Sequence, residues 1–356
     1  MHNIKLYDIV IIGAGASGLM TASLLDGRKL QICIIDSNST IGAKIKVSGG
    51  GKCNITNNYL KSSKYLGDDK FIQNVFKQFD NNDLLSFLNT NNLFPKLNEK
   101  IVKGTYFCNS SNEVLSLFKN LTKNVHFKLN TKVTEVNYNN DYFNIQTSKN
   151  IINAKKIIVA SGGKSFQNLG ASEIGYKIAQ NFRHKIVQLN PALVGFTVQK
   201  EQFWFKELSG LSLDVQIKVD DKTINGSMLF THKGCSGPVI LTTSLYWTKG
   251  KININFLPTK KSYLPKRFKK AIKELNINLT NYEMSPAGNY GYTKAEVTKG
   301  GVSTDEINPI TMESKLQKNL YFLGEVIDVT GELGGYNFQW AFSSAFACSK
   351  NLNSKN

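Results

Sequence analysis

Residues 6–36 read LYDIVIIGAGASGLMTASLLDGRKLQICIID, and this stretch decides the fold. The apolar run 9–12 is typical of a buried strand, and it stops at a glycine turn. Apolar residues at helical spacing follow from Leu19 to Leu25, and a second apolar run ends at Asp36. Strand, glycine turn, helix, strand and terminal acid, in that order, predict a dinucleotide-binding βαβ unit.

Each glycine of the turn has a separate role in such a unit. Gly13 permits the tight turn, Gly15 lets the backbone approach a pyrophosphate, and Gly18 lets the helix pack closely on the strand. The free amides at the helix N-terminus attract phosphates, and the terminal carboxylate accepts hydrogen bonds from ribose hydroxyls. The predicted cofactor-binding residues of this unit are Gly13, Gly15, Ala16, Ser17, Gly18, Asp36 and Ser37. A glycine turn without a ligand is the alternative, and the complete βαβ context argues against it.

The composition indicates a globular protein of two or three domains with an unusual charge. The chain has 356 residues, 41% of them hydrophobic, and no apolar run approaches the roughly 20 residues of a membrane span. Its five cysteines form no CxxC pair, which favours the reducing cytoplasm and predicts neither disulfides nor a metal site. The 44 basic and 26 acidic residues give a net charge of +18. This charge suits a polyanionic partner, most naturally nucleic acid, and compositional drift in an AT-rich genome is the alternative.

Three further segments carry a family resemblance. Residues 42–57 read GAKIKVSGGGKCNITN, residues 156–163 read KIIVASGG, and residues 331–341 read GELGGYNFQWA. Together with the glycine turn, they resemble the HI0933-like flavoproteins, which bind FAD on a glutathione-reductase-type Rossmann domain. The resemblance implies an α/β fold in which an inserted, mainly β substrate domain interrupts the FAD-binding domain. The implied boundaries are 1–190 and 299–356 for the FAD-binding domain and 191–298 for the insert.

The resemblance also implies most of the cofactor site. The glycine loop 48–51 is expected to run past the pyrophosphate toward the flavin ring. A helix N-terminus near residue 335 is expected at the flavin pyrimidine edge, where its dipole favours negative charge on the ring. The implied contacts beyond the first unit are Lys44, Ser48, Gly49, Gly50, Gly51, Lys52, Cys53, Asn54, Val133, Ser161, Gly162, Gly163, Gly324, Glu325, Asp328, Gly334, Gly335, Tyr336, Asn337, Phe338 and Gln339. Lys52 and Thr105 stand where the family usually has arginine, and Ile174 stands where an aspartate is common.

Basic residues gather in one segment of the expected insert. Four apolar residues there, Leu264, Phe268, Ile272 and Leu275, have the spacing of one helical face, which predicts a helix over residues 264–276 with its lysines exposed. The predicted RNA-binding residues are Lys260, Lys261, Lys266, Arg267, Lys269, Lys270 and Lys273. A solvated helix face is the alternative, and the concentration of charge favours an RNA-binding surface.

The resemblance implies a reaction class as well. Members of the family are associated with reduction of conjugated carbon–carbon double bonds, including uridine to dihydrouridine in large-subunit ribosomal RNA and enones in steroid-like molecules. Such a reduction adds a hydride to the carbon β to a carbonyl and a proton to the α carbon. The sequence has no second GxGxxG unit, so NADPH or NADH is expected to dock transiently as the electron donor. Cys53, Tyr336 and His232 are the candidate catalytic acids.

The sequence therefore predicts an FAD-dependent NAD(P)H oxidoreductase of the ribosomal RNA dihydrouridine synthase type. A small-molecule enone reductase or an amine oxidase of the same family is the main alternative, and the positive charge would then be compositional. The alternative outside the enzymes is a ribosome-associated protein that keeps FAD for structure only.

Overall fold

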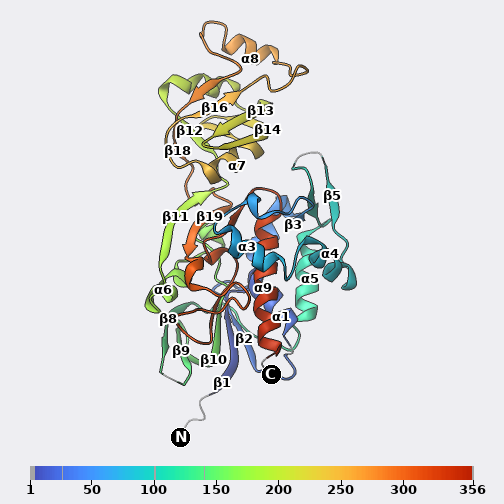
Figure 1. The fold of residues 1–356 in the computed structure, drawn as a ribbon, viewed down its shortest axis with the longest axis vertical. Coiled ribbons are helices and arrows are strands. Elements are labelled where there is room, and N and C mark those ends of the chain that lie inside the picture. Colours follow the sequence, from blue (N-terminus) through green and yellow to red (C-terminus); the bar gives the residue numbers. More distant parts are fainter. Residues whose placement is uncertain (1–4, 26, 100–101, 140, 355–356) are drawn as a thin grey trace. The chain divides into compact units, whose positions relative to one another are not determined.

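The computed structural model describes residues 5–25, 27–99, 102–139 and 141–354, and the chain divides into two compact units (Figure 1). The first unit is Met1–Leu189 with Thr298–Asn356, and the second is Asn190–Val297. The second unit is therefore a continuous insert in the first, and each unit has its own hydrophobic core. The boundaries expected from the sequence lie one residue away from these.

A mostly parallel sheet forms the centre of the first unit. Its order is β7 (His126–Lys128), β2 (Ile32–Ile35), β1 (Leu6–Ile12), β10 (Ile151–Val159), β9 (Phe143–Thr147) and β8 (Val133–Tyr138), and β20 (Leu320–Phe322) also pairs with β10. β1 runs parallel to β2 on one side and to β10 on the other. The first half of β10 pairs antiparallel with β9, and its carboxyl end pairs parallel with β20. The carboxyl ends of β1, β10 and β20 therefore meet at one edge of the sheet.

Helices cover this sheet, and short strands surround its carboxyl edge. The other elements of the first unit are α1 (Ala16–Leu24), α2 (Ala43–Val47), η1 (Ser48–Gly51), β3 (Asn54–Asn57), η2 (Ser62–Lys64), β4 (Tyr65–Leu66), α3 (Asp69–Phe76), α4 (Asn81–Thr90), β5 (Lys96–Asn98), β6 (Thr105–Phe107), α5 (Ser111–Leu121), η3 (Gln167–Leu169), α6 (Ile174–Asn181), β11 (Ile186–Ala192), β19 (Val297–Val302), η5 (Thr304–Glu306), η6 (Gly324–Val326), β21 (Thr330–Gly331) and α9 (Tyr336–Ser354). Helix α9, in red, runs beside α1 (Figure 1). Residues far apart in the sequence thus share one core.

Two glycines of the first turn are required by close backbone packing. Gly13 has φ +112°, and a β-carbon on it would lie 2.3 Å from the Ala160 carbonyl oxygen at the end of β10. A β-carbon on Gly18 would lie 2.0 Å from the carbonyl oxygen of Gly13. The turn therefore brings α1 down onto β1 and β1 against β10 with no room for a side chain, as the sequence predicts for these two positions.

The second unit is built on an antiparallel sheet. Its strands, in order, are β17 (Tyr282–Met284), β16 (Ile252–Asn255), β13 (Ser212–Val219), β14 (Lys222–Thr231), β15 (Gly234–Ser236), β12 (Phe196–Val198) and β18 (Pro286–Asn289). Its helices are η4 (Lys200–Leu208), α7 (Pro238–Tyr246) and α8 (Lys266–Ala271). Trp204 packs edge-on against Phe205, Phe268 and other aromatic rings of the core. The mainly β insert with a small helical segment has the predicted character.

The basic helix is shorter than the sequence suggests. Leu264 and Phe268 are buried, but α8 ends at Ala271, and Leu275 lies beyond it with 38% of its surface exposed. The apolar spacing over residues 264–276 continues beyond the last helical residue. The prediction of one helical face through Leu275 was therefore wrong.

No helix in the described part of the chain is long and apolar enough to cross a membrane.

His184 is a buried ionisable residue close behind α6. Its Nε2 lies 2.7 Å from Ser314 Oγ, its Nδ1 lies 3.3 Å from Glu306 Oε2, and its ring packs edge-on against Phe322. Burial lowers the pKa of His184, and the Glu306 carboxylate opposes this shift without reversing it. The native state therefore resists protonation of this ring.

This burial makes stability depend on pH. Below about pH 6.5, the ordinary pKa of histidine, the unfolded chain binds a proton that native His184 excludes. We therefore expect the free energy of unfolding to fall as the pH drops, by at most about 1.4 kcal/mol per pH unit for this group. In His184→Gln this part of the pH dependence should disappear. Urea titrations of both proteins at about pH 7.5 and about pH 5.5 measure it, and equal pH dependences would contradict the expectation.

Candidate functional site

The N-terminus of α1 leaves space in front of its backbone. A β-carbon on Gly15 would have no heavy atom within 4 Å, in contrast to Gly13 and Gly18. Gly15 is also the N-cap of α1, and no side chain caps the helix there. Free amides and the positive dipole end at an open glycine form an anion-binding arrangement. Ala16 and Ser17 begin this helix.

The Asp36 carboxylate is held at the same end of the sheet. Its Oδ2 accepts a hydrogen bond from the Ala14 amide (2.7 Å), and its Oδ1 accepts one from the Asn38 amide (2.8 Å). These bonds fix the carboxylate at the end of β2, beside the glycine turn. Each oxygen keeps a further lone pair for a hydroxyl donor. Ser37 follows it in an exposed position, with its Oγ 3.5 Å from the Gly170 carbonyl oxygen.

A second open glycine follows β10. Gly162 has φ +74°, and a β-carbon there would meet nothing within 4 Å. The preceding Ser161 has a buried Oγ without a hydrogen-bond partner. Gly175 provides room for this hydroxyl, because a β-carbon on Gly175 would lie 2.2 Å from it. Since Ile12 and Val159 pair at the ends of β1 and β10, the two glycine segments are neighbours. Gly163 is closely packed against Glu325 and Thr298 instead.

The predicted glycine loop consists of left-handed backbone. Gly49, Gly50 and Gly51 have φ values of +56°, +64° and +87°, and β-carbons on the last two would meet nothing within 4 Å. Ser48 begins the loop as the first residue of η1. Lys52 closes it, with its Nζ 5.5 Å from the centroid of the Phe107 ring. Such a loop offers backbone rather than side chains to a neighbour, and Asn54 then begins β3.

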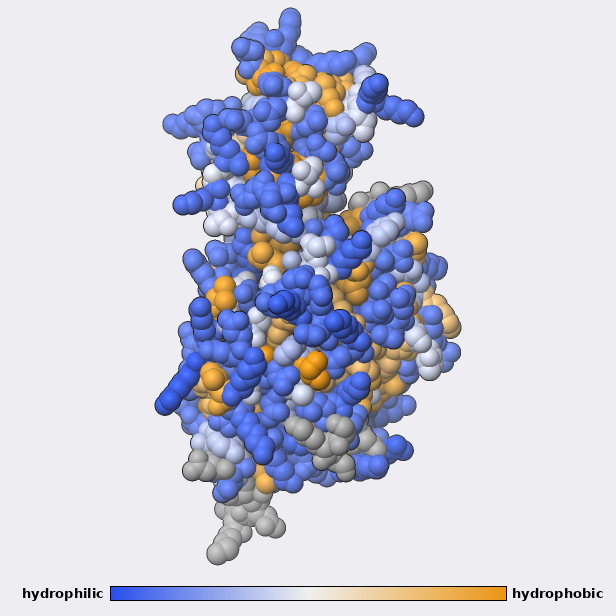
Figure 2. Space-filling model, in the orientation of Figure 1, coloured by the Kyte–Doolittle hydropathy of each residue, from blue (hydrophilic) through white to orange (hydrophobic). Residues whose placement is uncertain are grey.

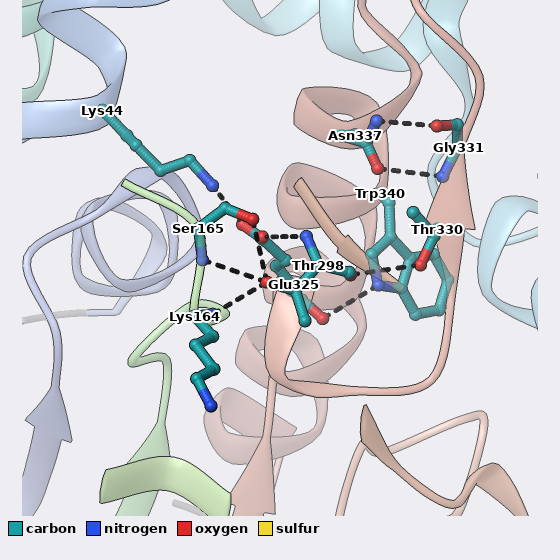
Figure 3. Close-up of polar contacts among 10 residues, drawn as sticks. Lys44, Lys164, Ser165, Thr298, Glu325, Thr330, Gly331, Asn337 and Trp340 are labelled. Carbon is teal, nitrogen blue, oxygen red and sulfur yellow. Dashed lines mark hydrogen bonds and ion pairs between the residues drawn. The ribbon is translucent and has the colours of Figure 1, made fainter. Parts of the chain in front are cut away.

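Glu325 is at the centre of a polar network between these segments (Figure 3). Its Oε2 accepts a hydrogen bond from Lys44 Nζ (2.5 Å), and its Oε1 accepts one from the Thr298 amide (2.9 Å). Thr298 Oγ1 in turn accepts hydrogen bonds from the amides of Lys164 (2.8 Å) and Ser165 (3.0 Å). The network ties α2, the loop after β10, β19 and η6 together. The side chains of Lys44 and Glu325, both predicted as cofactor contacts, are thus paired with each other.

The start of α9 is fixed by the strands beside it. A β-carbon on Gly335 would lie 2.4 Å from the Thr56 carbonyl oxygen, and Asn57 Nδ2 donates to the Gly334 carbonyl (3.0 Å). Thr105 Oγ1 donates to the same carbonyl (3.4 Å). Thr105, which stands in place of the family's arginine, therefore supports the glycine turn from inside the protein. Ile174, the other departure, is the first residue of α6.

Two predicted contacts on α9 have partners within the protein. Thr56 Oγ1 donates to Gln339 Oε1 (2.5 Å), and Gln339 Nε2 donates to Ser343 Oγ (2.9 Å), all buried. Asn337 closes a ring with Gly331, accepting from its amide and donating to its carbonyl, both at 2.9 Å (Figure 3). These side chains hold the turn before α9. Phe338 is partly buried against the core and stacks on Phe342.

The remaining predicted contacts are dispersed. Gly324 begins η6, and its carbonyl accepts a hydrogen bond from Trp340 Nε1 (3.1 Å). Burial raises the pKa of Asp328, whose amide donates to the Val302 carbonyl. Val133 begins β8 two residues after Thr131, whose amide donates to the Asp36 carbonyl (2.9 Å). The structure therefore brings the chain before Val133 to Asp36, at the end of β2.

The three candidate acids have different surroundings. Cys53 is fully buried, and burial raises the pKa of its thiol to about 12. Burial also raises the pKa of Tyr336, whose ring packs edge-on against Tyr65. Both are weaker acids than the free side chains on which the prediction relied. His232 is exposed in the turn between β14 and β15 of the second unit.

Sequence reasoning missed the residues that support the site. Thr56, Asn57 and Thr298 make the hydrogen bonds described above and carry no charge. Thr56 and Asn57 end the motif segment 42–57, but neither was predicted as a site residue. The only hint for Thr298 is its place just before Gly300 and Gly301, where the chain returns to the first unit. Among the described residues, no group of three or more His, Cys, Asp or Glu side chains could hold a metal ion.

Comparison with known proteins shows the family of this chain. The family described as "HI0933-like protein Rossmann domain" matches residues 7–351. The chain belongs to the HI0933-like family. This membership agrees with the resemblance seen in the glycine segments, and it extends across both units of the HI0933-like chain.

Two relatives span nearly the whole HI0933-like chain. The "Ribosomal RNA dihydrouridine synthase" of Escherichia coli K12 is 34% identical over 97% of this chain and 98% of its own length. The "3-dehydro-bile acid delta(4,6)-reductase" of Clostridium scindens is 29% identical over 95% of this chain and 97% of its own length. The names of both relatives denote enzymes that act on different classes of molecule.

Solved structures share the fold of this HI0933-like protein. The fumarate reductase subunit FrdA of Escherichia coli matches 99% of this chain and 70% of its own, with a TM-score of 0.55 and 11% identity. A 3-ketosteroid-Δ4-(5α)-dehydrogenase of Rhodococcus jostii matches 97% of each chain, with a TM-score of 0.53 and 11% identity. At this identity the likeness concerns the fold alone.

Two glycines of the turn, Gly15 and Gly18, provide a matched test of the site. Gly15→Val adds a side chain in open space at an extended backbone position, so the protein should fold but lose bound flavin. Gly18→Ala forces a methyl group against the Gly13 carbonyl, so it should lower the melting temperature instead. Visible absorbance and thermal melting of the purified variants distinguish the two effects. A folded Gly15→Val protein that keeps all its flavin would contradict the assignment.

Proposed function

We propose that this protein is an FAD-dependent reductase of a conjugated carbon–carbon double bond, and that its substrate is a uridine of ribosomal RNA. The observation that carries the proposal is the match, at 34% identity and almost full length, to ribosomal RNA dihydrouridine synthases of Escherichia coli and Haemophilus influenzae. Both units take part in that match, so it includes the insert as well as the dinucleotide-binding unit.

The residues at the sheet edge fit FAD. The open glycines 15, 50, 51 and 162 give backbone access for phosphates and a planar ring, and the uncapped α1 N-terminus suits a pyrophosphate. The Asp36 carboxylate suits ribose hydroxyls. The unpartnered Ser161 hydroxyl, adjacent to Gly162, is a further polar group that a cofactor could satisfy. When bound, FAD supplies the hydride chemistry that no side chain offers.

The protein's own residues would position the reaction. The start of α9 is locked by Thr56, Asn57 and Thr105, which keeps a helix N-terminus in a fixed place where negative charge can be stabilised. The Lys44–Glu325 pair and the Thr298 hydrogen bonds hold the loops around it. NADPH or NADH would bind transiently as the source of electrons, because the sequence has no second dinucleotide-binding fingerprint.

A small-molecule enone is the second candidate substrate. The Clostridium scindens relative, named as a bile-acid reductase, supports it at 29% identity. The net charge of +18 favours RNA over a small apolar substrate. Reduction of an enone, or steady oxygen consumption with an amine, in the absence of any RNA product would favour this candidate.

The first experiment expresses the gene in a bacterial host that lacks its own family member, and then maps dihydrouridine across the large ribosomal RNA. We expect one site to be restored. Asp36→Ala should abolish the restoration, because the carboxylate that holds the ribose region is lost. Thermal melting of that variant serves as the control for folding. A folded, yellow wild-type protein that restores no site would contradict the RNA substrate.

A charge-reversal variant tests whether the RNA binds at α8. Changing Lys266, Lys269 and Lys270 to Glu should abolish RNA reduction and leave flavin reduction by NAD(P)H intact, because phosphates lose their cationic partners. Arg267 is excluded because its guanidinium bonds the backbone of the second unit. Lys200, Lys218 and Lys249, exposed lysines of the same unit, provide a control with the same change in charge. Loss of both activities, or equal effects of both variants, would contradict the location.

A further inference from the structure

An exposed aromatic ring lies within the basic segment of the second unit. Among the large hydrophobic side chains of the described residues, Tyr263 is the most exposed, at 66%. The Nζ of Lys269 lies 5.1 Å from the centroid of its ring. Between Lys260 and Lys273 the chain has seven basic and no acidic residues. A solvent-facing ring is thus surrounded in sequence by cations, a combination that the spacing of apolar residues did not reveal.

The segment that carries this ring is fixed to the core. Arg267 Nη1 donates to the Ser209 carbonyl (3.1 Å), and its Nη2 donates to the Glu207 carbonyl. These bonds tie α8 to the end of η4, against which it packs. Leu264 and Phe268 are buried below it. Arg267 therefore holds the segment in place, and the ring and the lysines lie at the surface.

We propose that Tyr263, Lys266, Lys269 and Lys270, here called the α8 surface, bind single-stranded RNA, with an unpaired base stacked on Tyr263 and phosphates on the lysines. The proposal rests on the proposed function for its choice of RNA as the substrate. An exposed ring can stack on the face of a base, and lysines follow the phosphate backbone without reading sequence. In a duplex both faces of each internal base are covered by neighbours, so the ring has no partner there.

A lipid surface is a less suitable partner for the same residues. Figure 2 shows a hydrophobic area around α8, bordered by hydrophilic side chains. Peripheral helices bind lipid by inserting free apolar side chains. Here the bulky Leu264 and Phe268 are already buried in the core, and of the four apolar residues of the segment only Leu275 is exposed, at 38%. Beside this hydrophobic area, Tyr263 and the lysines expose a phenol ring and ammonium groups, which fit a nucleotide better than an acyl chain.

The test measures binding of the flavin-loaded, full-length protein to a fluorescent RNA of about 12 nucleotides, either single-stranded or annealed to its complement. We expect the wild type to prefer the single strand. Tyr263→Ala should weaken that binding about tenfold. Tyr263→Phe, which keeps the ring, should retain most of the wild-type affinity. Phe94→Ala is the matched control, because Phe94 is an equally exposed ring, at 64%, in the first unit. It should leave the affinity unchanged.

The salt dependence tests the lysines separately. Changing Lys269 to Gln should reduce the slope of log affinity against log salt by about 0.7 if one phosphate contact is lost. Tyr263→Ala should lower the affinity at every salt concentration and leave this slope unchanged. Such a separation supports stacking on the ring and ionic contact through the lysines.

Several outcomes would overturn the proposal. These are unchanged single-strand affinity in Tyr263→Ala, an equal loss in Phe94→Ala, or Tyr263-dependent binding to phosphatidylserine vesicles with no binding to the single strand. Dihydrouridine mapping in cells is read independently. If wild-type protein restores the modified site and Tyr263→Ala binds and acts as wild type does, the α8 surface assignment fails while the proposed function stands. If Tyr263-dependent binding is found but no site is restored, the proposed function fails while the α8 surface assignment stands.

Discussion

The contact between the glycine turn and the end of β10 is the constraint on which the rest of the first unit depends. Gly13 lies so close to the Ala160 carbonyl that a β-carbon would be 2.3 Å away. Because β1 and β10 are parallel and in register to their last residues, the glycine segments that follow them lie side by side. This places two stretches of open backbone, at Gly15 and Gly162, at one edge of the sheet, where ligands of such folds bind.

The local part of this arrangement could be predicted from sequence. Residues 6–36 contain the strand, turn, helix and acid in order, and the structure has β1, α1 and β2 at these places. The glycine loop 48–51 and the helix after Gly335 were also recognisable, because glycine and helix signals act over a few residues. The side chains that hold these segments in place could not be recognised from the sequence. Thr56 bonds Gln339, 283 residues away in the chain, and Thr298 bonds the Lys164 amide, 134 residues away, and no local signal marks these partners.

Burial was the second property that local patterns did not predict. The spacing of apolar residues in the segment 264–276 continues to Leu275, but α8 ends at Ala271 and Leu275 is exposed. Cys53 was chosen as an acid from its place in a polar glycine loop, yet its side chain turns into the core. Arg267 looked like one more cation in a basic run, and its partners are carbonyl groups at the end of η4. The end of α8, the burial of Cys53 and the partners of Arg267 each depend on which residues lie nearby in the folded protein.

The division of the chain has a consequence for the order of folding during synthesis. The second unit is continuous, from Asn190 to Val297, so all its strands are available once that stretch has left the ribosome. The first unit is not: β10 lacks its neighbour β20, and α1 lacks α9, until the last part of the chain has been made. Domains generally fold as units as they emerge. The insert is therefore complete before the domain that contains it, and the nascent dinucleotide-binding unit must wait with an unpaired strand edge.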